Sequence, residues 1–90
     1  MFIIAAYEGQ CIRVGNRMLK VGLMRSPGLV DVLVDNETEP FCISADRKTE
    51  IFPDVFLAME RNLHMGARVK FLFEAPSTVR IRELPHDPEP

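Results

Sequence analysis

The sequence is short of several features that commonly identify a protein class. It has no tryptophan, one tyrosine and two cysteines, Cys11 and Cys42, which lie far apart in strand-like settings. No disulfide framework or Cys-x-x-Cys motif is present, so we expect buried, reduced thiols, with a bridge between the two as the alternative. No apolar run reaches the roughly 18 residues of a membrane-spanning helix, and the start resembles no targeting peptide. A cytoplasmic location is therefore expected.

An excess of positive charge is also missing. The formal net charge is −2 and the isoelectric point about 5.6, which argue against a strongly cationic nucleic-acid binder. The charge is uneven, however, because residues 66–83 carry four basic residues, Arg68, Lys70, Arg80 and Arg82, and only two acidic ones. Any basic surface must be local.

Sites for enzymatic chemistry are lacking as well. The two histidines, His64 and His86, lie far apart with no cysteine at a zinc-binding spacing, and no glycine-rich phosphate loop follows a strand. The carboxylates are numerous but scattered. We therefore expect no enzyme, no cofactor and no metal site.

What is present is a globular composition, with 47% hydrophobic and 27% charged residues, typical of one domain over residues 1–84 with a flexible tail over 85–90. A lone chain of this size buries only about 60 to 65% of its unfolded surface, so dimerisation would relieve a shortage of core. Apolar and polar residues alternate in short segments separated by turn residues, which indicates antiparallel strands. The strands are expected over 2–7, 11–14, 18–25, 29–35, 41–43, 68–73 and 79–82, with a hairpin turn at Gly15-Asn16.

One helix is expected, over about 53–65. Pro53 suits the first helical turn, and Phe56, Met59 and Leu63 fall on one face at helical spacing. Gly66 is well placed to end it. The predicted fold class is therefore mainly β with one helix, a small antiparallel β-sheet domain.

With these residues in place, the chain resembles the carbon storage regulator family of bacterial RNA-binding translational regulators. The match runs over residues 1–35 without a gap, through Met1, Ile3, Ile4, Gly9, Ile12, Val14, Gly15-Asn16, Val30, Val32 and Val34. The resemblance implies a cytoplasmic, intertwined homodimer in which strands of one subunit complete the sheets of the other. It also implies GGA-containing loops of messenger or small RNA as the ligand.

Downstream, the resemblance allows two alignments. In the first, 41–44 is the family's fifth strand, 50–52 opens its C-terminal helix and 66–84 is an added hairpin. In the second, 69–83 supplies the fourth and fifth strands joined by the Ala75-Pro76 turn, and about 29–65 is a strand-and-helix insertion.

The resemblance also names candidate RNA-binding residues. The aliphatic residue of the first strand is Ile4, but the two consecutive arginines that follow it in the family are replaced by Ala6 and Tyr7, and Tyr7 offers an aromatic face for a base. The fifth-strand arginine corresponds to Arg47, with Lys48 beside it, in the first alignment. In the second it corresponds to Arg82, after a one-residue deletion, with Arg80 on the same face; a solvated outer strand face is the alternative explanation for this pair.

Two functions follow as expectations. One is an RNA-binding post-transcriptional regulator whose basic contacts have moved to Arg80 and Arg82, or to Arg47 and Lys48. The other is a protein-interaction module of the same fold that has lost RNA binding and modulates an orthodox family member or another protein. The acidic isoelectric point and the Ala6-Tyr7 replacement favour the second, and the basic segment 68–82 favours the first.

Overall fold

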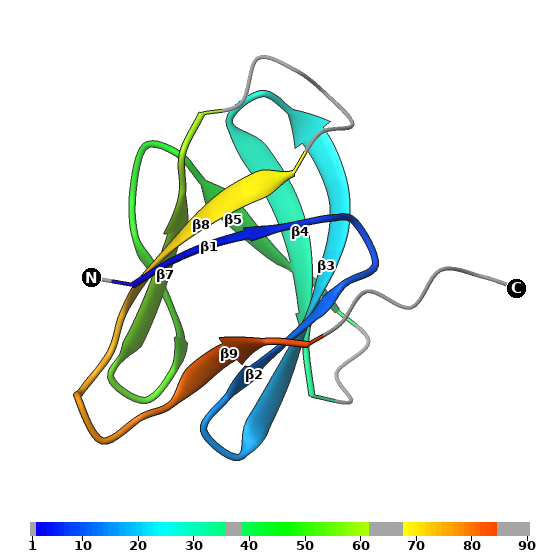
Figure 1. The fold of residues 1–90 in the computed structure, drawn as a ribbon. Coiled ribbons are helices and arrows are strands. Elements are labelled where there is room, and N and C mark those ends of the chain that lie inside the picture. The colour runs from blue at the N-terminus through cyan, green and yellow to red at the C-terminus, as the bar shows by residue number, and fades with distance from the viewer. Residues whose placement is uncertain (1, 36–38, 62–67, 85–90) are drawn as a thin grey trace, which may run out of the picture.

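The computed structural model describes residues 2–35, 39–61 and 68–84, and in these ranges the chain forms nine strands and no helix (Figure 1). The strands are β1 (Phe2–Ala6), β2 (Cys11–Val14), β3 (Arg17–Ser26), β4 (Leu29–Val34), β5 (Phe41–Ser44), β6 (Thr49–Phe52), β7 (Val55–Met59), β8 (Val69–Glu74) and β9 (Ile81–Glu83). The expected tail, 85–90, lies outside the described residues. The mainly β class is confirmed.

The strands form two antiparallel sheets. Sheet A has the order β1-β8-β7-β6, and sheet B has the order β5-β4-β3-β2-β9. The chain changes sheet after β1, after β5 and after β8, so neighbours in the sequence such as β8 and β9 belong to different sheets. The added hairpin that the first alignment places over 66–84 is therefore wrong, because β8 and β9 do not pair with each other.

Alternating burial produces one core between the two sheets. In β7 and β8, for example, every second side chain is buried, as a strand with one face toward the core requires. The buried apolar side chains of both sheets form a single cluster, whose largest fully buried members are Phe71, Phe73, Ile12, Leu19, Ile43, Leu57 and Met59.

The predicted helix at 53–65 is wrong over its described part, 53–61. Pro53 and Asp54 form the turn of a hairpin between β6 and β7, with Phe52 paired to Val55. Asp54 has a φ of 63°, a left-handed conformation that aspartate tolerates and that a helix does not contain. Residues 62–65 lie outside the described residues. Residues 50–52, which open a helix in the first alignment, belong to strand β6.

The Gly15-Asn16 turn is confirmed, since it joins β2 to β3 and Gly15 has the positive φ, 61°, of the first position of a II′ turn. Both cysteines are free, but only one is even partly buried. Cys42 is exposed because it points outward from the edge strand β5, next to the buried Ile43. The expectation of two buried thiols is thus wrong for Cys42.

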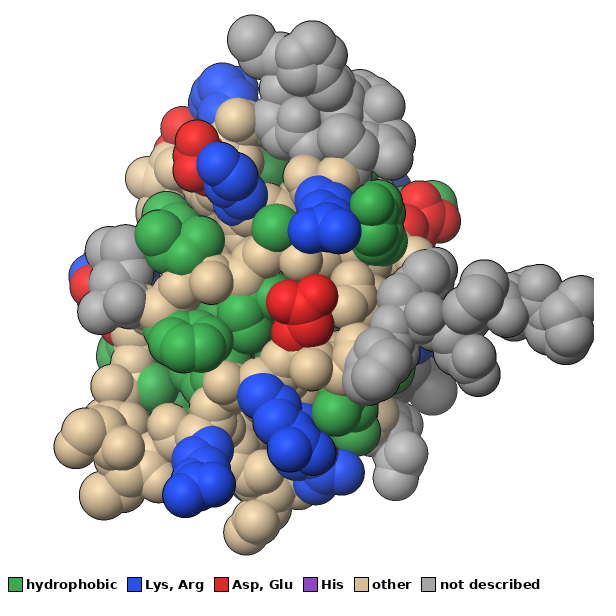
Figure 2. All heavy atoms as spheres, in the orientation of Figure 1, with side chains coloured by type: hydrophobic (Ala, Val, Ile, Leu, Met, Phe, Trp, Pro, Cys, Tyr) green, Lys and Arg blue, Asp and Glu red, His purple; other side chains and the backbone are tan. Residues whose placement is uncertain are grey.

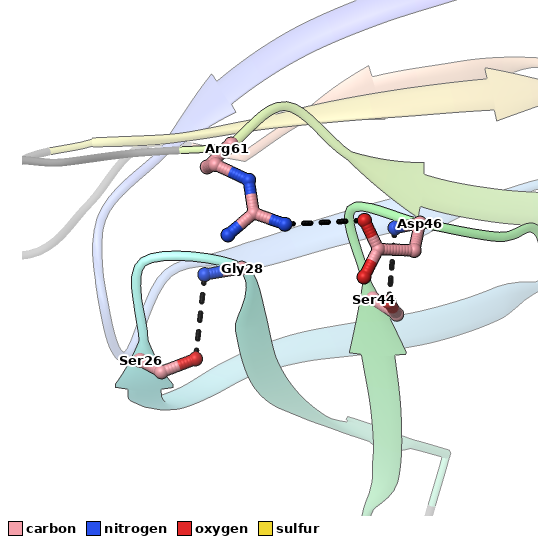
Figure 3. A network of polar contacts seen from close by, with 5 residues as sticks. All are labelled: Ser26, Gly28, Ser44, Asp46 and Arg61. Carbon is pink, nitrogen blue, oxygen red and sulfur yellow. Dashed lines mark hydrogen bonds and ion pairs between the residues drawn. The ribbon is translucent and has the colours of Figure 1, made fainter.

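A polar network joins loops of the two sheets (Figure 3). Arg61, which follows β7, donates a hydrogen bond of 3.1 Å to the Asp46 carboxylate in the β5–β6 loop. The Ser44 hydroxyl accepts the Asp46 N–H at 2.9 Å, and the Ser26 hydroxyl accepts the Gly28 N–H at 3.3 Å in the β3–β4 turn. The Ala45 N–H also donates to the Gly28 carbonyl at 2.9 Å, so the β5–β6 loop contacts both the β3–β4 turn and, through Asp46, the end of β7.

Gly22 in β3 provides a test of the close approach of β3 and β4. A Cβ added there would lie 2.8 Å from the backbone oxygen of Asp31, whereas one added at Gly28 would meet only the flexible end of Arg61, at 3.1 Å. We expect Gly22→Ala to lower the free energy of unfolding by about 1 to 3 kcal/mol, because the backbone must move. Gly28→Ala is the matched control and should change the free energy of unfolding little. Urea unfolding measures both variants, and an equal loss of stability in the two would show that the approach of Gly22 to Asp31 is not what limits the side chain.

Candidate nucleic-acid interface

The candidate site lies where one free edge of each sheet meets. In sheet A, β1 pairs only with β8, and in sheet B, β9 pairs only with β2, among the strands that the structure describes. The two unpaired edges run close to each other on the face shown in Figure 1. An edge strand presents unpaired N–H and C=O groups, so this region offers backbone hydrogen bonds to a ligand.

A groove opens between these two strands. It has a volume of about 540 Å³ and is lined by apolar side chains of both sheets and by the β8–β9 loop, namely Phe2, Phe73, Ala75, Pro76, Val79 and Ile81, with Ser77, Arg80 and Arg82 at its border. Figure 2 shows apolar side chains on this face, with basic side chains on both sides of them. Phe2 is 46% exposed, so its ring is accessible to a ligand in the groove. Phe73 is buried and forms part of the apolar floor of the groove.

The side chain of Gln10 ties the end of β1 to the end of β9. Its Oε1 accepts the Tyr7 N–H at 3.0 Å, while its Nε2 donates to Glu83 Oε1 at 3.1 Å and to the Leu84 carbonyl at 3.0 Å. Gln10 itself is buried. Because one amide satisfies partners from both sheets, it fixes the separation of the two edges at this end of the groove.

Three arginines gather beside the groove. Arg82 of β9 lies directly opposite Arg13 of β2, and Arg80 comes just before the start of β9, two residues before Arg82. All three are exposed. Ile81 and Glu83 flank Arg82 and lie opposite Val14 and Ile12, which are buried in the core, so Arg13 and Arg82 occupy the outward face of sheet B. The predicted pairing of Arg80 with Arg82 is consistent with this geometry.

Tyr7 follows β1 at the end of the groove that Gln10 holds. The Arg68 guanidinium lies 4.9 Å from the centre of the Tyr7 ring, a cation–π contact. A hydrogen bond that Arg68 donates to the Tyr7 hydroxyl raises the pKa of Arg68, with a smaller contribution from the Glu83 charge. Arg68 therefore already covers one face of the ring, and a base would have only the other face to stack on.

The remaining candidate residues lie elsewhere. Ile4 is buried in the core, and the exposed aliphatic residue of β1 is Ile3. Arg47 and Lys48 occupy the β5–β6 loop, where Lys48 forms an ion pair of 2.6 Å with Glu74. The structure thus brings Arg80 and Arg82 together at the groove but places Arg47 and Lys48 at another part of the surface.

Sequence reasoning missed Phe2, Gln10, Arg13 and Arg68. Phe2 was identifiable as an apolar residue at the start of an edge strand, but the other three acquire their positions from contacts between distant segments.

Among the described residues, no group of three His, Cys, Asp or Glu side chains is arranged to hold a metal ion. The same residues contain no helix long and apolar enough to cross a membrane.

The groove and its arginines suit an extended anionic ligand with apolar faces. No family model matches the chain, and no curated protein or solved structure is significantly similar to it.

Proposed function

We propose that the chain is an RNA-binding post-transcriptional regulator of the bacterial cytoplasm that holds a single-stranded GGA-containing segment along the groove between β1 and β9. The observation that carries the proposal is the meeting of two free strand edges at an apolar groove bordered by Arg80 and Arg82. Single-stranded RNA presents to a protein the chemistry that these groups complement, namely unstacked bases and phosphates.

The parts of the groove divide the recognition between them. Phe2 offers a ring on which a base stacks, the arginines at the border contact phosphate, and the β1 and β9 backbones offer hydrogen bonds to base edges. The order β8, Ala75-Pro76 turn, β9 also agrees with the second alignment to the carbon storage regulator family, in which RNA follows the first and fifth strands. This resemblance supports the choice of RNA as the ligand.

The test is a gel-shift titration of the full chain with an RNA hairpin that carries GGA in its loop and with a hairpin whose loop lacks it. We expect submicromolar binding of the first that weakens steeply between about 50 mM and about 200 mM salt, because phosphate contacts release counterions. The double variant Arg80→Ala and Arg82→Ala should abolish the shift. No shift by the unaltered protein at about 10 µM, where contacts of this kind would still be visible, would refute the proposal.

A protein-interaction module is the second candidate, and a specific observation favours it. The free edge of β1, Phe2–Ala6, carries no charged residue, whereas natural edge strands are commonly protected by charges or proline. Such an edge suits the addition of a strand from another protein or from a second copy, including the homodimer that the resemblance implies. Within one chain β1 already pairs with β8 and β9 with β2, so a partner would add to these sheets at their free edges.

Co-expression with an orthodox family member distinguishes this candidate. Native mass spectrometry should then show a mixed dimer if the module modulates that relative. If only homodimers are found while the RNA titration is positive, RNA regulation is the better assignment.

A further inference from the structure

Three like charges, which we call the arginine face, gather on the outward side of sheet B: Arg13 and Arg82 on neighbouring strands, and Arg80 just before the start of β9. Arg13 and Arg82 are directly opposite each other across β2 and β9. Lys20 of β3 faces Cys11, two residues along β2 from Arg13, so it is a diagonal neighbour of this cluster. Basic residues therefore lie on three neighbouring strands, β9, β2 and β3.

No acidic partner offsets these charges in the part of the chain that the structure describes. The ion pairs found there involve Arg17, Arg25, Lys48 and Arg61, and none involves a member of the arginine face. The outward neighbours of Arg13 along β2 and β3 are Cys11 and Met18, which are uncharged. Like charges directly opposite each other in a sheet disfavour folding. The arrangement is thus unfavourable for the isolated fold.

We propose that the arginine face binds the phosphodiester backbone of RNA that flanks the segment in the groove, so that the RNA continues around the β9 edge onto the outside of sheet B. The inference rests on the proposed function and extends it to a second contact surface. Arg82 borders the groove and also belongs to the arginine face, which makes the two surfaces continuous. Arg13 and Arg82, about 5 Å apart across two strands, and Arg80 just before β9 provide a row of donors for successive phosphates.

The test uses two RNAs, a minimal GGA-loop hairpin and the same hairpin with single-stranded extensions, and the variant Arg13→Thr. Threonine favours strands, so the substitution removes the charge and retains the fold. We expect the affinity for the extended RNA to fall about tenfold and the slope of its salt dependence to fall by about one, as for one lost phosphate contact. The minimal hairpin should bind as before, because Arg13 lies outside the groove.

Arg47→Thr, which removes the same charge from the β5–β6 loop, is the matched control and should leave the binding of both RNAs unchanged. Thermal melting of Arg13→Thr should show equal or greater stability than the unaltered chain, which separates a binding effect from unfolding. Unchanged binding of the extended RNA overturns the inference, and so does an equal loss for both RNAs, while the proposed function stands. If the unaltered protein binds neither RNA, the proposed function itself fails.

Discussion

Gln10→Glu should lower the free energy of unfolding by about 3 to 5 kcal/mol at neutral pH, because it places an unpaired negative charge in a buried position. The native amide donates to Glu83 Oε1 and to the Leu84 carbonyl, and a carboxylate has no proton to donate to either. The Tyr7 N–H would keep its acceptor. The variant should therefore lose the hydrogen bonds that connect Gln10 to β9 and Leu84 and keep the one that connects it to Tyr7 after β1.

The same variant should regain stability in acid. Burial and the neighbouring Glu83 carboxylate disfavour the charged form of the new side chain, so its pKa in the folded state should exceed the value of about 4.3 for an unfolded glutamate. The free energy deficit should shrink as the pH falls toward and through that folded-state pKa, since protonation restores a donor. Urea unfolding at neutral and mildly acidic pH measures the change.

A double variant provides the control. Adding Glu83→Gln to Gln10→Glu reverses the direction of the hydrogen bond, because the amide at position 83 can donate to the new carboxylate. We expect it to recover part of the lost stability at neutral pH. If Gln10→Glu is as stable as the unaltered chain at neutral pH, the hydrogen bonds of Gln10 do not hold the ends of β1 and β9 together.

Strand positions could be predicted from the sequence because burial alternates with period two. Residues 68–73 show this alternation, and the structure has strand β8 there. Residues 29–35 show it in their sequence, and strand β4 forms there, although Asp31 is buried as well as Val30 and Val32. The hairpin at Gly15-Asn16 was predictable for a different reason, since glycine supplies the positive φ that a tight hairpin requires. Local chemistry and local pattern agree at these positions.

Residues 53–61 were mispredicted because two periods fit the same side chains. Phe56 and Met59 suit one helical face, but Val55, Leu57 and Met59 suit one strand face equally well. Pro53 is as favourable in a turn as in a first helical turn. The strand forms because pairing with β6 and β8 turns Val55, Leu57 and Met59 into the core between the two sheets, a gain that only the assembled fold provides.

The candidate site was predictable only in part. The alternation of Arg80 and Arg82 with Val79 and Ile81 places both arginines on one face, and this needs no knowledge of the fold. The register that sets Arg13 opposite Arg82 joins two ends of the chain, and no local pattern specifies it. The buried position of Gln10 likewise depends on Leu84 and Glu83, which arrive from the far end of the sequence.

Arg82→Glu should change RNA binding and stability in opposite directions. Loss of one charge-assisted contact, about 1.5 to 3 kcal/mol, weakens binding by roughly 10- to 150-fold, and the new negative charge repels phosphate in addition, so we expect a loss of about 100-fold or more. At the same time a glutamate opposite Arg13 converts a repulsive cross-strand pair into an attractive one, worth about 0.2 to 1 kcal/mol. Titration with the GGA-loop hairpin and urea unfolding measure the two effects.

The expected opposite changes in RNA affinity and in stability distinguish a ligand-binding role of Arg82 from a structural one. A substitution that damages the fold reduces binding and stability together, whereas a residue retained for a ligand reduces binding while the fold gains. Arg47→Glu makes the same change in net charge on the β5–β6 loop and should alter RNA affinity little, which separates the position of Arg82 from the overall charge of the chain. If Arg82→Glu lowers stability and leaves RNA affinity unchanged, Arg82 serves the sheet, and the ligand of the groove is not RNA held by this arginine.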